Sequence, residues 1–379
     1  MYKNAYKTYK YKFIFCRENM GFNKFVIDTT ALKYNVSKLK KMIGSRVKLC
    51  GVVKAEAYSH GGVIVANAIK DDCDFFAVAC VKEAMELRDR KIENNILILG
   101  IIPNSDLKYC IFNNISICLS SISQLYDILS TLKQLNLGDN DCLKIHLKIN
   151  TGLNRLGISK LSEFKKILKL LESSRNIVLE GIFTHFATKS NDNEFVIEQY
   201  NTFKKFTSLV DNNRIIIHCN NSYATTRFPE YFNSMVRCGF LMYGGISGYK
   251  PVLNIATQIV NLNQVENGSI GYDRTIWVRD RLIAVIPIGY ADGFDRRLSN
   301  NFRVLVNGEY ANVVGNICMD MCMIDVTDIP DVEIGTKVTL LGEDGDKAIS
   351  INDYADALGT SPYEVLLKFD SRRMDIIEL

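Results

Sequence analysis

The sequence is poor in the patterns that mark metal centres and disulfide scaffolds. It contains only four histidines, His60, His146, His185 and His218, and no two of them have metal-ligand spacing. Its eleven cysteines are scattered and include no CxxC pair, which argues against a zinc cage or a disulfide framework. We therefore expect no metal, free thiols, and a reducing cytoplasmic location, where cysteines mostly behave as small buried hydrophobes.

Long apolar stretches and a strong charge imbalance are also missing. No run approaches the roughly 18 apolar residues that a membrane helix needs, so no membrane partner is expected. The opening MYKNAYKTYKYKFIFCREN is basic but lacks the features of a signal peptide, and we expect residues 1–22 to form an exposed arm. A net charge of +4, from 46 basic and 42 acidic residues, gives little support to nucleic-acid binding.

What the chain does have is a regular alternation of apolar patterns. ALKYNVSKLKKMI has the spacing of an amphipathic helix, and short apolar runs follow it. Such runs suit strands buried on both faces, while LSEFKKILKLLESS and NEFVIEQYNTFKKFTSLV between them have helical spacing. The runs read KLCGVVK, FFAVA, ILILG, SICLS, KIHLKIN, LEGIFTHF, IIIHCN and MVRCGF.

Alternating strands and helices predict parallel βαβ units. About eight units within residues 23–250 favour an α/β fold of the TIM (β/α)8 barrel type, with a doubly wound sheet as the alternative. After Pro251, short alternating strands separated by NG, DG and GY turns predict a mostly β C-terminal domain over residues 251–379. Two short helices, in ISINDYADALG and SPYEVLLKF, begin at capping-competent Asn or Ser residues.

Lys54 is the first candidate for chemistry, because it ends an apolar run in VVKAEAYSHGG. Barrel enzymes carry their reactive groups at the C-terminal ends of strands. A lysine among apolar neighbours has a lowered pKa and can act as an imine-forming nucleophile. Position alone leaves open that Lys54 is an ordinary solvated lysine.

The segment KAEAYSHG, with Lys54, Tyr58, His60 and Gly61, resembles the cofactor-lysine signature of the alanine racemase family. The similarity continues in the family's order over about residues 23–370. The pieces include HLKINTGLNRLGI, GIFTHFA, NNSYATTRFPE, VRCGFLMYGG, GYDRTIW, IPIGYADGFDRRLSN, VNGEYANVVGNICMDMCMIDVTDIP and YEVLLKF. The resemblance implies a pyridoxal 5'-phosphate-dependent isomerase that interconverts L- and D-alanine for the cell wall. It also implies a homodimer with shared active sites.

The resemblance assigns two bases, one for each face of the cofactor. Lys54 would carry the cofactor and serve one face, and Tyr272 would arrive from the second subunit to serve the other. A free tyrosine has a pKa near 10, so its neighbours must lower it for work near neutrality. The cofactor-binding residues implied in addition to Lys54 are Tyr58, His185, Asn221, Ser222, Arg237, Gly239 and Phe240.

Within this set, the phosphate would be held by Tyr58, Ser222 and the backbone amides of Gly239 and Phe240. Arg237 would face the pyridine nitrogen and keep it unprotonated, which weakens the ring as an electron sink and favours prompt return of the proton. The resemblance also suggests that His185 bonds to Tyr272, with Arg237 behind the imidazole. His146 and His218 lie in strand patterns and are expected to be buried core or barrel-lining residues.

The substrate carboxylate would be bound by Arg155, whose guanidinium fork suits it, and by the backbone amide of Met319 from the second subunit. Lys148 matches a lysine that is often carbamylated in the family and that orients the carboxylate-binding arginine. Tyr290 and Asp320 would complete the surroundings of the site.

Several positions depart from the family pattern. Ser371, in SRRMD, is aligned with a family tyrosine that reaches the phosphate, so a larger or hydroxylated substrate side chain would gain space. Ser190 and Asn316 replace an acidic residue and an arginine near the entrance, while Arg296 is retained. Glu56 and Asn150 also depart from the pattern, and the sequence offers no physical account of them.

Three alternatives stay open. The first is a racemase for serine or for a broader set of small amino acids, which would share the mechanism. The second is a related pyridoxal-phosphate decarboxylase, although such enzymes usually pair the pyridine nitrogen with glutamate where this chain has Arg237. The third is a non-catalytic cofactor-binding barrel protein, although such relatives lack the β domain that supplies Tyr272 and Met319.

Overall fold

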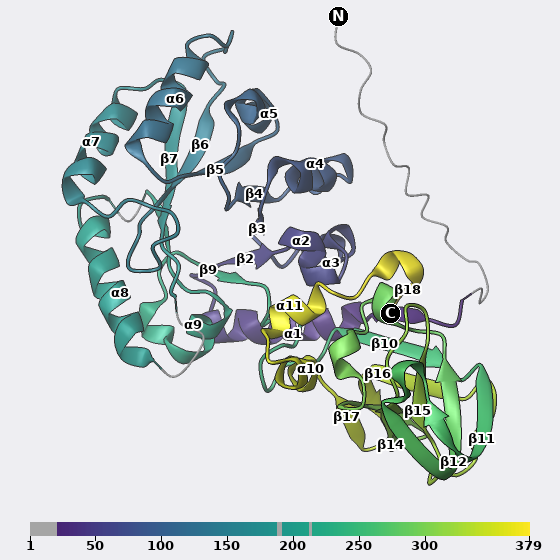
Figure 1. Cartoon of the computed structure of the whole chain (residues 1–379). Helices are drawn as coiled ribbons and strands as arrows, with labels where there is room; N and C mark the ends of the chain where they lie inside the picture. The colour runs from purple at the N-terminus through teal and green to yellow at the C-terminus, as the bar shows by residue number, and fades with distance from the viewer. Residues whose placement is uncertain (1–20, 188–191, 212–213) are drawn as a thin grey trace, which may run out of the picture.

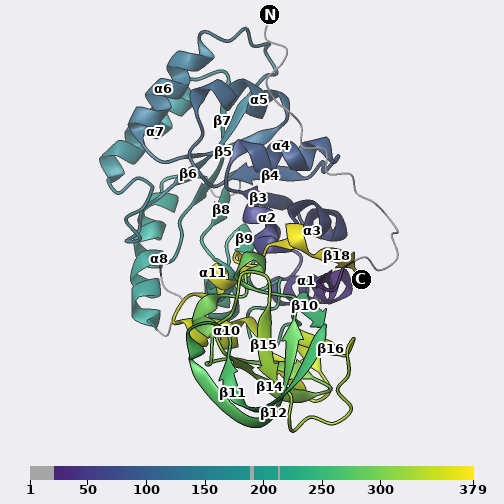
Figure 2. The ribbon, with the colours of Figure 1, turned by 45° about the vertical axis from the view of Figure 1, so that its right-hand side comes forward.

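A computed structural model describes residues 21–187, 192–211 and 214–379 (Figure 1). The N-terminal arm expected over residues 1–22 therefore lies almost wholly outside the described residues. The described chain forms two units, a helix-covered parallel sheet and a mostly β unit beside it (Figure 2).

The first unit is a parallel sheet in the order β8-β7-β6-β5-β4-β3-β2-β9. The ends of this sheet approach each other, since Ser234 N donates to Ile217 O at 2.9 Å and Arg237 N donates to Asn220 O at 3.0 Å. The eight strands coincide with the eight predicted apolar runs, and the nearly closed barrel confirms the predicted fold class. They are β2 (Lys48–Val52), β3 (Phe75–Val78), β4 (Asn95–Ile98), β5 (Ile115–Leu119), β6 (Leu143–Lys148), β7 (Ile177–Phe183), β8 (Ile216–His218) and β9 (Met235–Cys238).

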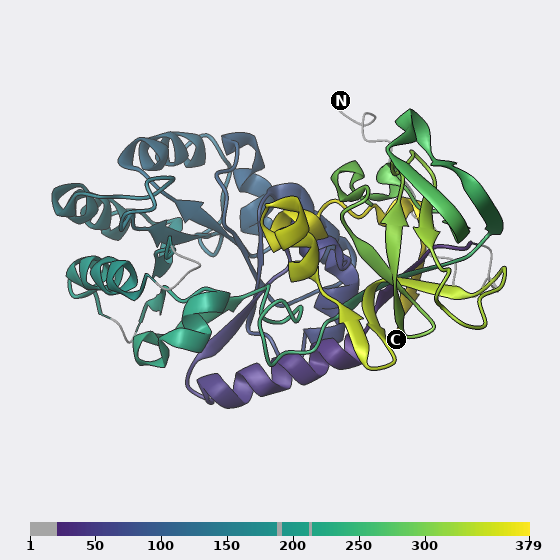
Figure 3. The same ribbon diagram turned by 60° about the horizontal axis from the view of Figure 1, so that its bottom comes forward.

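The helices of this unit bury one apolar face each. In α1, Leu32, Val36, Leu39 and Ile43 are buried at helical spacing, and the Asp28 side chain caps its first turn. Figure 3 shows α1 running along both units. The helices are α1 (Thr29–Ile43), α2 (Lys54–Ser59), α3 (Gly62–Ile69), α4 (Val81–Asp89), α5 (Leu107–Phe112), α6 (Ile122–Leu132), α7 (Leu161–Glu172), α8 (Asn193–Thr207) and α9 (Ser222–Arg227).

The interior of the barrel is apolar on one side and polar on the other. Strands β2, β3, β4 and β9 contribute a cluster that includes Phe75, Leu97 and Met235. Strands β6 and β8 instead contribute His146 and His218, both fully buried. The expectation that these two histidines are buried is confirmed.

The second unit is a mixed sheet in the order β11-β12-β15-β14-β13-β16-β10-β1-β18, with β17 paired to β16. Its strands are β1 (Lys24–Ile27), β10 (Leu253–Gln258), β11 (Asn261–Ile270), β12 (Ile276–Ile286), β13 (Arg303–Val306), β14 (Glu309–Val314), β15 (Cys322–Asp325), β16 (Lys337–Asp344), β17 (Lys347–Ile349) and β18 (Asp375–Glu378). The predicted mostly β C-terminal region is present, together with α10 (Ile351–Leu358) and α11 (Pro362–Leu366). Ser350 and Ser361 are the N-cap residues of these two helices.

The sheet pairing corrects one boundary. Strand β1, which we expected to belong to the barrel domain, pairs antiparallel with β10 and parallel with β18. Its apolar residues Phe25 and Ile27 are buried, so the first strand of the chain completes the sheet of the second unit. The ten described cysteines are free. Among the described residues, no helix combines the length and apolar character needed to span a membrane.

Candidate active site

The segment that carries Lys54 has an unusual backbone. After β2, residues Ala55 to Ser59 all have φ between 51° and 69°, so α2 turns in the left-handed sense. Such a turn is sterically costly for non-glycine residues and persists only where the surroundings hold it. Here Glu83 accepts hydrogen bonds from Ala55 N at 2.8 Å and Ala79 N at 2.6 Å, and Ala57 N donates to Val53 O at 2.9 Å.

Glu56, which the sequence left without an explanation, helps to end this turn. Its carboxylate accepts from Gly62 N at 3.0 Å, at the start of α3, and its carbonyl accepts from Gly61 N at 2.9 Å. The turn therefore presents Lys54 and Tyr58 toward the end of the barrel.

Lys54 lies half-buried at this end. Burial lowers its pKa first, the Arg155 cation lowers it further, and Glu83 opposes the shift. The neutral amine is thus accessible at a lower pH than for an exposed lysine, which is what a nucleophile or proton acceptor requires.

An anion cradle lies beside Lys54, where β8 and β9 end. The Ser222 hydroxyl accepts from the amides of Gly239, at 3.1 Å, and Leu241, at 3.3 Å. A Cβ atom at Gly239 would lie 3.0 Å from both the ring and the hydroxyl of Tyr58, so a larger residue there would have to displace the Tyr58 side chain. The hydroxyls of Ser222 and Tyr58 thus lie close to the Gly239 backbone, and hydroxyl donors suit a phosphate.

Two further residues frame this cradle. Asn221 caps α9, because its side chain accepts from Ala224 N at 2.9 Å. The ring of Tyr363, from α11, stacks on Phe240 with centroids 4.3 Å apart and lies edge-on to Tyr58 at 5.6 Å. The sequence analysis missed Tyr363, although it lies in YEVLLKF, one of the segments that carry the family resemblance.

Ser371, the residue predicted to enlarge the pocket, follows Tyr363 in the sequence. Ser371 lies in the 3-10 turn Ser371–Arg373, eight residues beyond Tyr363, and the aromatic contacts with the cradle come from Tyr363. The aromatic contacts add Tyr363 to the surroundings of the cradle, and the effect of Ser371 on the pocket stays a prediction. Ser190, the other altered entrance residue before the β domain, lies outside the described residues.

Arg237, on β9, is buried in the barrel. Its guanidinium donates to His218 Nδ1 at 2.9 Å, and to the carbonyls of Thr184 at 2.8 Å, Cys219 at 3.1 Å and His218 at 3.1 Å. The side-chain partner of Arg237 is thus His218. Sequence reasoning had placed Arg237 behind His185, whose pKa is held well below its usual value by burial first and then by the Arg237 and Arg155 cations.

Arg155 lies on an exposed loop whose shape depends on Asn150. The Asn150 side-chain Oδ1 accepts from Gly152 N at 3.1 Å and Asn154 N at 3.0 Å. Its side-chain Nδ2 donates to Asn154 Oδ1 at 2.9 Å and Ser159 Oγ at 3.1 Å. A carboxylate could not make the last two bonds as a donor, which gives this departure from the family a physical role.

Lys148 ends β6 in the same region, buried, with its amine 5.4 Å from the Phe183 ring centroid. Burial lowers its pKa, and the cations of Arg155, Arg237 and Lys54 act in the same direction. A neutral buried lysine amine is the form that could be carbamylated, so the environment suits that expectation.

The remaining predicted residues lie elsewhere in this chain. Tyr272, Tyr290, Met319 and Asp320 line a second cavity of about 730 Å³ in the β unit, together with Arg296. Tyr272 and Met319 are 70% and 54% exposed, so both are available to another molecule. The structure does not bring them to Lys54 within one chain.

Local contacts hold this second group in place. Asn316 donates to Tyr272 O and Asp273 Oδ2, both at 3.1 Å, and so fixes the turn that carries Tyr272. Gly289 allows the loop before Tyr290 to pack on the 318–319 backbone, since a Cβ there would lie 2.3 Å from Cys318 O. Asp320 accepts from Arg373 at 2.7 Å.

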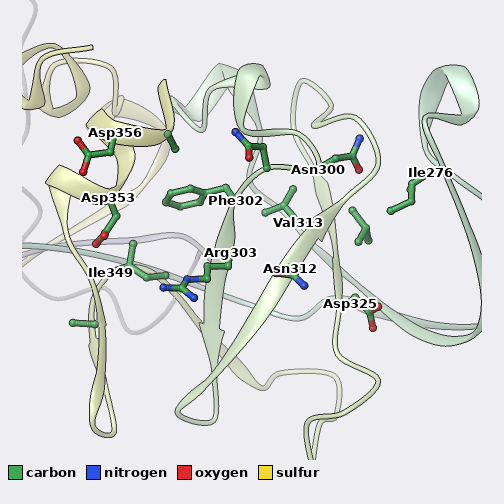
Figure 4. Close-up of a pocket in the computed structure, with 14 residues that line it drawn as sticks. Ile276, Asn300, Phe302, Arg303, Asn312, Val313, Asp325, Ile349, Asp353 and Asp356 are labelled. Atoms are coloured by element: carbon green, nitrogen blue, oxygen red, sulfur yellow. The ribbon is translucent and has the colours of Figure 1, made fainter. Parts of the chain in front are cut away.

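A third hollow, of about 600 Å³, lies in the β unit between α10 and strands β13 and β14 (Figure 4). Arg303, Asp353 and Phe302 are among the residues that line it. Its lining contains none of the predicted site residues, so it is separate from the site described above.

A barrel with a half-buried lysine after its first strand, an anion cradle at the ends of β8 and β9, and an appended β unit defines a class of pyridoxal-phosphate enzymes. Comparison with known proteins narrows this class. The family model "Alanine racemase, N-terminal domain" matches residues 27–247, and "Alanine racemase, C-terminal domain" matches residues 252–377. The chain belongs to the alanine racemase family.

Individual relatives agree with this assignment. Alanine racemase 2 of Caldanaerobacter subterraneus subsp. tengcongensis is 38% identical over 357 residues, covering 89% of this chain and 90% of the relative. The crystal structure of alanine racemase from E. faecalis superposes with a TM-score of 0.90 at 32% identity, covering 95% of this chain and 98% of the other. The alanine racemase of Bacillus anthracis with bound L-Ala-P has a TM-score of 0.86 at 32% identity, and 96% of each chain is covered.

Proposed function

We propose that this protein is a pyridoxal-phosphate-dependent amino-acid racemase that interconverts L- and D-alanine and supplies D-alanine for the cell wall. The observation that carries the proposal is the joint presence of Lys54, with its lowered pKa, and the cradle of Tyr58, Ser222 and Gly239 at one end of the barrel. The similarity to named alanine racemases over 89% of the chain supports alanine as the substrate.

The residues fit the cofactor. The cradle would take the phosphate, Lys54 would hold the carbonyl carbon, and Arg237 would face the ring nitrogen as a donor that carries no transferable proton. Bound pyridoxal phosphate supplies an electron-withdrawing ring that acidifies the α-proton of an attached amino acid.

The chain's own residues then move that proton. The Lys54 amine would accept or return it at the α-carbon on one face, and the Tyr272 hydroxyl of a second copy would do so on the other. Arg155 would hold the substrate carboxylate between the two bases, and the loop fixed by Asn150 would keep Arg155 in place.

We propose a homodimer because the two bases lie apart within one chain and Tyr272 is exposed. Mixing the Lys54→Ala and Tyr272→Phe variants tests this directly. In a hybrid dimer one site regains both bases, so random pairing restores about one quarter of the wild-type activity. Recovery of no activity from hybrids shown to form would refute the shared site, as would a catalytically competent monomer.

Serine, or a broader set of small amino acids, is the alternative substrate. Its basis is Ser371, which stands where the family resemblance implies a tyrosine and would leave space for a larger or hydroxylated side chain. The cytoplasm is the proposed location, supported by the ten free cysteines among the described residues.

The first experiment incubates the cofactor-loaded protein with L-alanine or L-serine in deuterium oxide. We expect exchange of the α-proton, measured by NMR, and formation of D-alanine, measured by chiral chromatography. A clear preference for serine would refute alanine as the substrate. Carbon dioxide release, or cofactor binding without exchange on either amino acid, would favour a decarboxylase or a binding protein instead.

A further inference from the structure

A chain of polar side chains runs through the polar half of the barrel and begins at Arg237. Arg237 donates to His218 Nδ1 at 2.9 Å, His218 Nε2 lies 2.8 Å from His146 Nδ1, and His146 Nε2 lies 3.0 Å from Glu180 Oε2. The two imidazoles are fully buried and come from β8 and β6. Within the described part of the chain, the hydrogen bonds of His146 and Glu180 involve His218, Ser116 and each other, and none joins them to Arg155 or Ser222.

The two ends of this chain fix its direction. A guanidinium can only donate and an ionised carboxylate can only accept, so each imidazole must accept at Nδ1 and donate at Nε2. Both histidines then have one tautomer and are neutral. Burial lowers the pKa of His218, and the Arg237 cation lowers it further, in accord with the neutral form.

At the other end of this chain, the surroundings of Glu180 keep its carboxyl group ionised. Burial alone would raise its pKa, but His146, Ser116 and Lys144 hold that pKa at about 2. The Ser116 hydroxyl donates to the same carboxylate oxygen as His146, and the Lys144 amine lies 3.4 Å from the other oxygen. No other group in the cluster can take the role of terminal acceptor.

Arg237 itself has no carboxylate partner within the described residues. Its other hydrogen bonds end on backbone carbonyls. The Phe183 ring packs against both members of this pair, stacked on His218 at 4.9 Å and with the Arg237 guanidinium 5.5 Å from its centroid. The nearest anion along the hydrogen-bonded path is therefore Glu180, two imidazoles away.

We propose that Glu180 is a positioning residue of the racemase site, which acts through His146 and His218 to hold the Arg237 guanidinium in one orientation. The inference rests on the proposed function in one respect, namely that Arg237 faces the cofactor ring. Without the carboxylate, the Nε2–H of His146 would be buried without an acceptor, which is costly. The pair would then favour the opposite tautomers, and His218 would turn an N–H toward the donors of Arg237.

Two variants separate this role from simple packing. In Glu180→Gln the side-chain oxygen still accepts from His146, so the tautomers persist. In Glu180→Leu no acceptor is left, so the tautomers change. Glu163→Leu is the matched control, since Glu163 accepts from Ile122 N at 3.1 Å between helices outside the barrel.

The primary measurement is 15N NMR of the histidine rings in the cofactor-free protein, which is simple because the sequence has four histidines. We expect His146 and His218 to be protonated at Nε2 alone in the wild type and in the Gln and control variants. Protonation of Nδ1 on either ring in the wild type would overturn the proposal, as would unchanged tautomers in Glu180→Leu. If the Leu variant does not fold, the wild-type measurement still decides whether the chain has this direction.

Kinetics of the loaded enzyme then test the link to catalysis. We expect Glu180→Leu to lower kcat by roughly tenfold with little change in KM, and Glu180→Gln to lower it by no more than about threefold. Altered tautomers with an unchanged kcat would overturn the positioning role. Lack of racemase activity in the wild type would instead refute the proposed function and leave the tautomer result standing.

Discussion

Replacement of Ala55 by glycine should stabilise the protein, although alanine is normally the better residue in a helix. Ala55 has φ of 51° and ψ of 54° in the left-handed turn that follows Lys54. This conformation costs a non-glycine residue about 1–2 kcal/mol, whereas glycine adopts it without this steric cost. Glycine loses about 0.4–1 kcal/mol through the greater freedom of the unfolded chain. We therefore expect Ala55→Gly to raise the free energy of unfolding by about 0.5–1 kcal/mol.

The control is Ala68→Gly, in the right-handed helix α3, where the side chain is half-buried like that of Ala55. Here glycine should lower the free energy of unfolding by about 1 kcal/mol. Both variants are compared by urea unfolding at one protein concentration, because stability of a dimer depends on that concentration. Equal losses of stability in the two variants would show that residue 55 is not left-handed and would refute the reasoning.

Three further predictions concern the site. Asn150→Ala removes four hydrogen bonds from the Arg155 loop, so we expect steady-state kinetics to show a KM for alanine raised roughly tenfold. The control Asn261→Ala, on β11, should leave the KM unchanged. Equal effects of the two variants would argue against a role specific to the loop. Arg155→Met removes a cation that lowers the pKa of Lys54, so we expect that pKa to rise. The pKa is measured from the pH dependence of Lys54 acylation in the cofactor-free protein. An unchanged midpoint would contradict the electrostatic coupling between Arg155 and Lys54. Gly239→Ala places a methyl group in the phosphate cradle, so we expect the affinity for the cofactor, measured by fluorescence titration, to fall at least tenfold. Retained affinity would show that the phosphate binds elsewhere.

The sequence by itself determined the architecture and the position of the lysine. Apolar runs for strands buried on both faces are local patterns, so all eight barrel strands could be predicted, and Lys54 could be placed at the end of the first. The change to alternating strands after Pro251 likewise marked the second unit.

Tertiary structure decided what depends on contacts between distant segments. Strand β1 pairs with β10 and β18, more than 200 residues away in the sequence, and so the hydrogen-bonding groups along its two edges are satisfied within the sheet of the second unit. Tyr363 reaches the phosphate cradle only because α11 folds back against α2. Similarly, the hydrogen bond from Arg237 to His218 could not be read from the sequence, since it depends on how β8 and β9 meet in the barrel.

Backbone conformation was also beyond the sequence. Nothing in KAEAYS favours a left-handed turn, and alanine and glutamate are good formers of right-handed helix. Glu83, from α4, contributes to holding the turn, since it accepts hydrogen bonds from the amides of Ala55 and Ala79. A contact with a distant segment thus acts against the local preference at the residue next to Lys54.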